Sequence, residues 1–387
     1  MAKRKKICFV TTISLTIKSF LIDFGRYLSE NENYDVTFIC NTDVSMYEYE
    51  TEHIHYIPVK MKRGIAFDGL GVIWHLYKIF NREKFDIVQY STKNASVYTC
   101  IAGSMAGIKT RIYCQWGMMF VAMHGIKRYL IKASELLISG LATDIESESF
   151  SIYNAALKEK VYTAKKACVI WNGSACGVNL DGYDISKREQ WRKEIRERYN
   201  IPADAVVFGW CGRITRDKGH NELFSAFREL NKTDKNTRLL MVGSYDNVET
   251  IDKELFDWTQ NCPEVIFTGY SKDVPKMYSA MDVFCSLSYR EGFGLVVIEA
   301  AAMGLPGIVT DVPGQIDTHV NMETGISVHA KDVVSVVDAM KYYIDNPSKR
   351  VAMGIEARKQ VERKYDQKML FKKLAQHRDQ LIIKNNA

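Results

Sequence analysis

The stretch DVFCSLSYREGFGLVVIEAAAMGLPGIVTD (residues 282–311) decides the fold class of this chain. It opens with a short apolar run, passes through a turn that contains two glycines, continues as an apolar run of helical length and ends in a second strand-like run, GIVTD. A strand, a helix and another strand in this order form a parallel βαβ unit. The stretch therefore predicts an α/β fold.

The same alternation continues on both sides of this stretch. Runs rich in β-branched and aromatic residues, typical of buried parallel strands, alternate with helical patterns. The predicted strands cover 6–12, 35–41, 85–91, 111–117, 205–212, 238–244, 264–270, 282–288 and 307–311, and the predicted helices include 19–30, 69–83, 95–107 and 187–200. The pattern indicates doubly wound parallel sheets.

The rhythm breaks at WNGSACGVNLDGYD (171–184), which is dense in Gly, Asn and Asp and is typical of a linker. A chain of 387 residues suits two domains. We therefore expect two Rossmann-like domains that face across a cleft, one at 1–178 and one at 179–366. The segment 367–387, with its amphipathic run MLFKKLAQHRDQLII, is expected to cross back to the first domain.

Composition excludes several classes of protein. No apolar run is long enough to span a bilayer and the amino-terminal apolar stretch is too short for a signal peptide, so we expect a cytoplasmic protein. The nine cysteines form no C-x-x-C pair, which favours buried hydrophobes over a zinc or disulfide framework. A dinucleotide oxidoreductase is disfavoured because no G-x-G-x-x-G follows the first strand, and nucleic-acid binding because no known motif is present.

The basic surplus lies in the first half. Residues 1–178 hold 22 Lys and Arg against 16 Asp and Glu, whereas residues 179–387 hold 30 of each. One basic segment, GMMFVAMHGIKRYLIK (117–132), is also rich in Met and aromatic residues. It is predicted either as a helix on an anionic membrane surface or as a solvated basic rim over a core helix.

Two carboxylates bracket the central turn. Gly292 and Gly294 would let the backbone approach a ligand, and a helix that starts near Gly294 would aim its first amides at an anion or a hydroxyl. Glu291 stays on the loop, while Glu299 falls about five residues into the helix. An alternative is that Glu291 is an acid at a helix start and Glu299 a surface residue. Against it, a Glu on a buried helix needs hydrogen bonds, which sugar hydroxyls would supply.

A second turn supplies cations. The predicted strand 205–212 runs into GRITRDKGH (212–220), where Arg213, Arg216 and Lys218 crowd within six residues. Arg offers a bidentate fork and Lys a point charge to phosphate oxygens. This turn suits a diphosphate.

Together these segments resemble the donor domain of the retaining family 4 glycosyltransferases of GT-B fold. The resemblance is carried by GRITRDKG, by the E-x7-E spacing of Glu291 and Glu299, by the G-x-P at 304–306 and by NGSACGVNLDGYD in place of that family's N-G-V-D segment. In the first half, TTISLTIKSFL (11–21) and residues 94–117 look most like enzymes that assemble bacterial capsule or O-antigen polysaccharides.

The resemblance implies a donor site in the second domain and an acceptor site in the first. The leaving phosphate would take the acceptor proton, so no dedicated nucleophile, metal or cofactor is expected. The implied roles are Arg213 and Lys218 for the diphosphate, Glu291 for the donor sugar, the amides of Phe293, Gly294 and Leu295 near it, Glu299 for the ribose, and Tyr270 to Val274 for the base.

Two departures concern the first domain. Many relatives have Gly-Gly after the first strand, where this chain has Thr11, Thr12 and Ile13. Many also carry a His at the end of the strand at 111–117, near the reacting sugar. Cys114 or Gln115 occupies that place, and His124 lies further on as a substitute.

We therefore expect transfer of a hexose or N-acetylhexosamine from a nucleotide-diphosphate sugar, with UDP as the nucleotide, to a saccharide acceptor. A polyprenyl-diphosphate-linked acceptor at the inner face of the cell membrane would explain the basic, Met-rich first half. Two alternatives remain open: a nucleotide-sugar epimerase of the same fold, and a protein that binds nucleotide sugars without catalysis.

Overall fold

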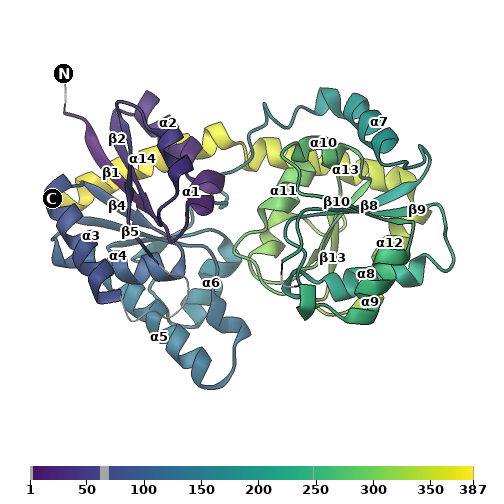
Figure 1. Ribbon diagram of the computed structural model, residues 1–387, viewed down its shortest axis with the longest axis horizontal. Coiled ribbons are helices and arrows are strands. Elements are labelled where there is room, and N and C mark those ends of the chain that lie inside the picture. Colours follow the sequence, from purple (N-terminus) through teal and green to yellow (C-terminus); the bar gives the residue numbers. More distant parts are fainter. Residues whose placement is uncertain (1–2, 62–68, 247, 387) are drawn as a thin grey trace. The chain divides into compact units, whose positions relative to one another are not determined.

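A computed structural model describes residues 3–61, 69–246 and 248–386 of the chain (Figure 1). The chain divides into two compact units, each described by itself. Unit 1 comprises residues 1–176 and 368–387, and unit 2 comprises residues 177–367.

Unit 1 is built on a seven-stranded, all-parallel sheet in the order β3-β2-β1-β4-β5-β6-β7. Its strands are β1 (Lys5–Val10), β2 (Tyr34–Cys40), β3 (Ile54–Pro58), β4 (Ile87–Tyr90), β5 (Thr110–Gln115), β6 (Asp144–Ser147) and β7 (Ala167–Cys168). Its helices are α1 (Ser14–Phe20), α2 (Ile22–Asn31), α3 (Gly69–Glu83), α4 (Lys93–Met105), α5 (Gly125–Leu141), α6 (Phe150–Lys158) and α14 (Gln367–Asn386).

Helices cover both faces of this sheet. Helices α3, α4 and α5 pack side by side over one apolar core, and α14, the yellow helix in Figure 1, lies with α2 on the other face. The ring of Phe24 on α2 lies 5.2 Å from that of Phe371 on α14. Helix α14 thus completes the sheet packing of the first unit.

Unit 2 has a six-stranded parallel sheet in the order β10-β9-β8-β11-β12-β13. Helices α8, α9 and α12 cover one face, and α7, α10, α11 and α13 the other. The strands are β8 (Val206–Cys211), β9 (Thr237–Val242), β10 (Val265–Gly269), β11 (Val283–Ser286), β12 (Gly307–Thr310) and β13 (Gly325–Val328). The helices are α7 (Arg188–Arg198), α8 (His220–Leu230), α9 (Lys253–Asn261), α10 (Val274–Ser279), α11 (Leu295–Ala302), α12 (Val333–Asp345) and α13 (Pro347–Lys364).

The predicted α/β class with two doubly wound parallel sheets is confirmed, and two local predictions are wrong. The helix expected at 19–30 is two helices, α1 and α2, which meet at Leu21. The segment 117–132 is not one helix, because Met123 and His124 are extended and Gly125 has a φ of 61°. A 3-10 turn (Met119–Ala122) therefore precedes α5. Among the described residues, no helix combines the length and apolar character needed to cross a bilayer.

Each sheet has one point where the strand order reverses. In unit 1 the chain moves outward from β1 through β2 to β3 and then returns to β4 on the other side of β1. In unit 2 the same reversal separates β8 from β11. Ligands of open parallel sheets bind at the carboxyl ends of the strands at such a point.

Candidate active site

Two loops meet at the reversal point of unit 2, one after β8 and one after β11. Gly219, in the first loop, has a φ of 77°, a conformation that favours glycine. A Cβ atom there would lie 2.1 Å from the carbonyl oxygen of Leu287 in the second loop. Only glycine allows this approach, so the sequence at Gly219 brings the two loops together.

The approach joins two of the predicted site residues. Lys218 Nζ lies 2.6 Å from Glu291 Oε1, although 73 residues separate them in the chain. The hydroxyl of Ser288 donates to the same oxygen at 2.8 Å. Both charged side chains retain some exposure, 25% for Lys218 and 17% for Glu291. An ammonium and a carboxylate therefore stand together, within reach of a ligand, at the carboxyl edge of the sheet.

Helix α11 begins where the sequence predicted. Its N-cap is Gly294, with a φ of 97°, and Leu295 is its first residue. The first amides of a helix have no partner within the helix, so they are available to a ligand. The ring of Phe293 is buried and packs edge-on against Tyr365 at 5.4 Å. Phe293 can therefore offer a ligand its main chain but not its side chain.

Glu299 is the fifth residue of α11 and is half-buried. Burial raises the pKa of Glu299 to about 7, against hydrogen bonds from Tyr278 and Tyr183 that lower the pKa. The hydroxyl of Tyr278 lies 3.3 Å from Glu299 Oε2. This carboxylate changes its charge near neutral pH, and a ligand hydroxyl would add a third hydrogen bond to it.

Arg213 takes a different partner from Lys218. Its guanidinium, 63% exposed, forms an ion pair of 2.5 Å with Asp246, in the loop after β9. A hydrogen bond joins the loop after β9 to the loop after β8, because the amide of Asp246 donates to the carbonyl oxygen of Ile214 at 3.1 Å.

The residues predicted to bind the nucleotide base follow β10, which lies two strands from β8. Tyr270 is 75% exposed, and Val274 is the first residue of α10.

Sequence reasoning missed several partners of these residues. Ser288 lies only three residues before Glu291, and a hydroxyl so close to a carboxylate was the available clue. Asp246 and Tyr278 come from other loops and helices, and nothing in the local sequence links them to Arg213 or Glu299.

Hydroxyl groups occupy the reversal point of unit 1. The hydroxyls of Thr12, after β1, and Thr92, after β4, lie 2.9 Å apart, and the amide of Thr12 donates to Thr92 Oγ1 at 3.0 Å. Thr92 has a φ of 65°, which is unusual for a β-branched residue. The amide of Ala95 also donates to Thr12 Oγ1, at 3.3 Å. Thr12 and Thr92 thus join the loops after β1 and β4.

Cys114, Gln115 and His124 are the three candidates to take the place of the usual acceptor-side histidine, and their surroundings differ. Cys114 is buried with its Sγ 3.7 Å from Glu146 Oε2, and burial with that nearby carboxylate raises the pKa of the Cys114 thiol well above its ordinary value. Gln115 is buried and accepts from the hydroxyl of Tyr162 at 2.8 Å; within the described residues, its Nε2 has no partner. His124 is exposed at the N-cap of α5.

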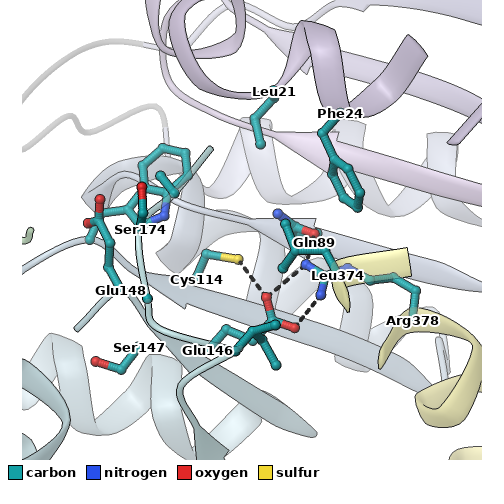
Figure 2. Close-up of a pocket in the computed structure, with 14 residues that line it drawn as sticks. Leu21, Phe24, Gln89, Cys114, Glu146, Ser147, Glu148, Ser174, Leu374 and Arg378 are labelled. Atoms are coloured by element: carbon teal, nitrogen blue, oxygen red, sulfur yellow. Dashed lines mark hydrogen bonds and ion pairs between the residues drawn. The ribbon is translucent and has the colours of Figure 1, made fainter. Parts of the chain in front are cut away.

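Glu146, the neighbour of Cys114, belongs to a buried network of ion pairs and hydrogen bonds (Figure 2). Arg378 on α14 is 1% exposed and donates to Glu146 Oε2 and to Gln89 Oε1, each at 2.7 Å. Burial opposes the charge on Glu146, but Arg378 and His377 prevail and lower the pKa of Glu146 to about 2. A cavity of about 30 Å³, large enough for a water molecule, is lined by Arg378, Glu146 and Gln89. The network fastens α14 to the sheet.

Neither a cluster of metal-ligand side chains nor a disulfide occurs in the part of the chain that the structure describes. No group of three His, Cys, Asp or Glu side chains is placed to hold a metal ion among those residues. The nine cysteines are free, and seven of them are buried.

Comparisons with known proteins agree with this architecture. Residues 192–360 match the family described as Glycosyl transferases group 1, and residues 6–145 match Glycosyl transferase 4-like. The chain is 30% identical over 376 residues to the capsular polysaccharide biosynthesis glycosyltransferase CapM of Staphylococcus aureus, and the match covers 96% of both chains. It is 23% identical, over 82% of both chains, to the Escherichia coli UDP-Gal:alpha-D-GlcNAc-diphosphoundecaprenol alpha-1,3-galactosyltransferase.

Solved structures share the fold over almost the whole length. A glycosyltransferase from Rickettsia africae superposes with a TM-score of 0.80 at 19% identity and covers 98% of this chain and 99% of its own. HepE of Anabaena, solved with UDP and glucose, superposes with a TM-score of 0.77 at 17% identity and covers 97% of this chain and 99% of its own. The chain therefore belongs to the group 1 glycosyltransferases and has their GT-B fold.

Proposed function

We propose that this glycosyltransferase moves a hexose or N-acetylhexosamine, with retention at the anomeric carbon, from a UDP-sugar to a saccharide acceptor in surface polysaccharide biosynthesis. The observation that carries the proposal is the Lys218–Glu291 pair at the reversal point of unit 2. The names of the relatives support it, since CapM serves capsular polysaccharide biosynthesis and HepE was solved with UDP and glucose.

The donor chemistry follows from the charges at this point. Lys218 and Arg213 would neutralise the diphosphate, and the first amides of α11 would add a partial positive charge. The bond between the anomeric carbon and the β-phosphate oxygen breaks, and the acceptor oxygen bonds to the same face of that carbon. The acceptor proton passes to the leaving phosphate. Because these groups supply the positive charge, the proposal requires no divalent metal and no cofactor.

The remaining donor contacts are also part of the proposal. Glu291 would hold the donor sugar, Glu299 the ribose hydroxyls, and the segment from Tyr270 to Val274 the base. Unit 2 (residues 177–367) would bind the donor, and unit 1 (residues 1–176 and 368–387) the acceptor.

The first test is nucleotide release from a panel of UDP-, GDP- and ADP-sugars, with and without a lipid extract as acceptor and with EDTA throughout. The native chain is compared with Lys218→Ala and Glu291→Ala, and with Lys232→Ala as a matched control, since Lys232 is 63% exposed and pairs with Glu229 on the surface. Acceptor-dependent release of UDP, lost in the two site variants and kept in the control, is expected. If no nucleotide is released from any of these sugars, the proposal is wrong.

The product distinguishes transfer from the alternatives. The anomeric proton coupling of the isolated product, measured by NMR, is expected to match that of the donor sugar. An inverted coupling would refute retention. Conversion of one UDP-sugar into its epimer without any acceptor would instead support the epimerase alternative.

A lipid-linked acceptor, polyprenyl-diphosphate-linked as in the name of the E. coli relative, is the finer part of the proposal. Helix α5 supports it with an exposed apolar stripe: Ile126 is 78%, Tyr129 73% and Leu130 63% exposed. Not all of the basic residues on α5 are free to contact lipid. Arg128 and Lys132 both pair with Glu159 at 2.8 Å, so Lys127 and the apolar stripe would make the contact at the inner face of the membrane.

This contact is tested by co-sedimentation with vesicles of neutral lipid with and without an anionic lipid. The variant Ile126→Ser with Leu130→Ser is expected to lose most of the bound fraction, and Lys127→Gln to lose the difference between the two vesicle types. The control is Ile383→Ser on α14, where the side chain is 72% exposed. Equal sedimentation of the α5 variant and the control would contradict membrane contact.

A further inference from the structure

A second pocket lies in unit 2, at the opposite ends of the strands from the candidate active site. Its volume is about 340 Å³, within the range of small-molecule sites. Asp282 and Pro306, which line it, directly precede β11 and β12, so the pocket opens at the amino ends of the strands. Lys218 and Glu291 lie at the carboxyl ends. The pocket is therefore separate from the proposed donor site.

The lining is strongly cationic. Four basic side chains contribute to it: Arg188 from α7 and Arg350, Arg358 and Lys359 from α13. Its one carboxylate, Asp282, is already neutralised by Arg192 and Arg196, each at 2.8 Å. The positive charge of the pocket thus exceeds the negative charge that lines it.

Two of the four cations form no ion pair among the described residues. Arg358 pairs with Glu362 at 2.6 Å and Lys359 with Glu356 at 2.7 Å. Within the described residues, Arg188 and Arg350 have no carboxylate at ion-pair distance. The Nε atom of Arg188 is also buried without a hydrogen-bond partner there. A buried donor on an uncompensated cation is costly, and a bound anion would relieve that cost.

Main-chain carbonyls hold both guanidiniums in place. Arg350 Nη1 donates to the carbonyl oxygen of Tyr343 at 2.8 Å, and Arg188 Nη1 to that of Gly304 at 3.3 Å. Gly304 has a φ of 71°, and a Cβ there would lie 3.1 Å from Arg188 Nη1. The two forks are thus oriented before any ligand arrives, which reduces the entropy lost on binding.

The other wall is apolar and open. Val351 is 60% exposed and Ile355 is 52% exposed on the same face of α13. Inorganic phosphate alone would leave these side chains in water. A ligand with a carbon skeleton would cover them.

We propose that this pocket binds a small organic phosphate ester, with its phosphate between Arg188 and Arg350 and its carbon skeleton against Val351 and Ile355. The site goes beyond the proposed transfer reaction and does not depend on it. Planar guanidiniums bind phosphate oxygens bidentately, which explains why two arginines stand here rather than two lysines.

Titration calorimetry on the full chain tests the site, with glucose 6-phosphate, inorganic phosphate and glucose as probes. The native chain is expected to bind glucose 6-phosphate more tightly than inorganic phosphate, and glucose not at all. Arg188→Gln with Arg350→Gln is expected to weaken binding by about tenfold or more. Lys349→Gln, which removes one charge from an exposed neighbour on α13, is the matched control and should bind as the native chain does.

Two further variants make the result decisive. Val351→Glu places a carboxylate at the rim without disturbing the guanidinium–carbonyl bonds, and it is expected to abolish phosphate binding even if the double Gln variant folds poorly. Lys218→Ala is expected to leave glucose 6-phosphate binding unchanged. The proposal is overturned if no phosphate binds, if Val351→Glu binds normally, or if Lys218→Ala removes the binding. Equal affinity for inorganic phosphate and glucose 6-phosphate would contradict the inference that the ligand is an organic phosphate.

Discussion

The two units share one topology but place different chemistry at the same point. At the reversal point of unit 2, the loops after β8 and β11 carry an ion pair, Lys218 with Glu291. At the corresponding point of unit 1, the loops after β1 and β4 carry two neutral hydroxyls, those of Thr12 and Thr92. The same topology thus carries opposite charges at one point and neutral hydroxyls at the other, and a few loop residues make the difference.

Unit 1 also has a strong ion pair, but that pair serves the stability of the unit. Arg378 and Glu146 are almost fully buried and bind each other, so they are not available to a ligand. The side chains of Lys218 and Glu291 remain partly exposed. We therefore expect variants in unit 1's pair to change stability, and variants in unit 2's pair to change activity.

The largest expected effect is on the stability of unit 1. Arg378→Ala removes the guanidinium from the buried carboxylate of Glu146, leaves the ring of His377 beside it, and should lower the free energy of unfolding by about 3–5 kcal/mol. Arg82→Ala, at a surface pair with Glu83 in the same unit, should cost less than about 1 kcal/mol. Urea unfolding measures both. Equal costs for the two variants would show that the buried network is not what fastens α14.

The next effect is on activity. Lys218→Thr replaces the ammonium with a neutral hydroxyl like those of unit 1 and should lower kcat/KM for the donor by about 10²- to 10³-fold, because the leaving diphosphate loses a cation. The unfolding midpoint should change little, since Lys218 is partly exposed. Steady-state kinetics with the donor varied checks this. Unchanged kcat/KM would mean that charge at this point is not what distinguishes the units.

The third effect is a pH dependence of donor binding. Ribose hydroxyls donate more strongly to an ionised carboxylate than to a neutral one, so nucleotide affinity should rise as the pH rises through about 7, the pKa of Glu299. Binding below that pH should release a proton. Calorimetry in two buffers of different ionisation enthalpy measures the release. Glu299→Gln should bind more weakly with no such pH dependence, and a native profile in this variant would exclude Glu299.

Glu299 should also affect stability with a definite sign. Its pKa in the folded chain is raised to about 7, above the ordinary value for Glu, so the folded state binds more protons between these values. Its contribution to stability is complete below about pH 4.3 and is lost as the pH rises through 7. Without ligand, Glu299→Gln should therefore raise the melting temperature at pH 8 more than at pH 4. The opposite order would contradict the raised pKa.

The smallest effect is expected at the hydroxyl pair of unit 1. Thr12→Val removes the bonds of its hydroxyl with Thr92 and Ala95 and should cost about 1 kcal/mol of stability. If this point binds the saccharide, KM for the acceptor should rise while nucleotide affinity stays the same. Kinetics with each substrate varied separately checks this. A change in nucleotide affinity alone would contradict the division of roles between the units.

The sequence predicted the fold class, and it placed in unit 2 two residues, Lys218 and Glu291, that the structure brings together. Each strand of the predicted βαβ units is a dense apolar run, and the loops after β8 and β11 are short and rich in Gly and charge. Lys218 and Glu291 could be assigned to one ligand because both follow strands of one predicted sheet. Their direct contact of 2.6 Å was not predictable, since it depends on Gly219 packing against Leu287.

What escaped prediction is short or depends on distant contacts. Strands β3 and β13 lie at the edges of their sheets and have only four or five residues, too few for a clear apolar pattern. The helix expected at 117–132 failed because Gly125 was not recognised as a helix boundary. Asp246 binds Arg213 only because β9 lies beside β8, and the sequence near Arg213 does not reveal it.

The return of α14 to unit 1 has a consequence for how the chain matures on the ribosome. Unit 2 is one continuous segment and can fold while α14 is still in the exit tunnel. Unit 1 must wait, because Glu146 lacks the charge of Arg378 and Phe24 lacks the ring of Phe371 until α14 emerges. The half that is made first is therefore finished last, and the newborn chain must protect an incomplete apolar face throughout synthesis of the other half.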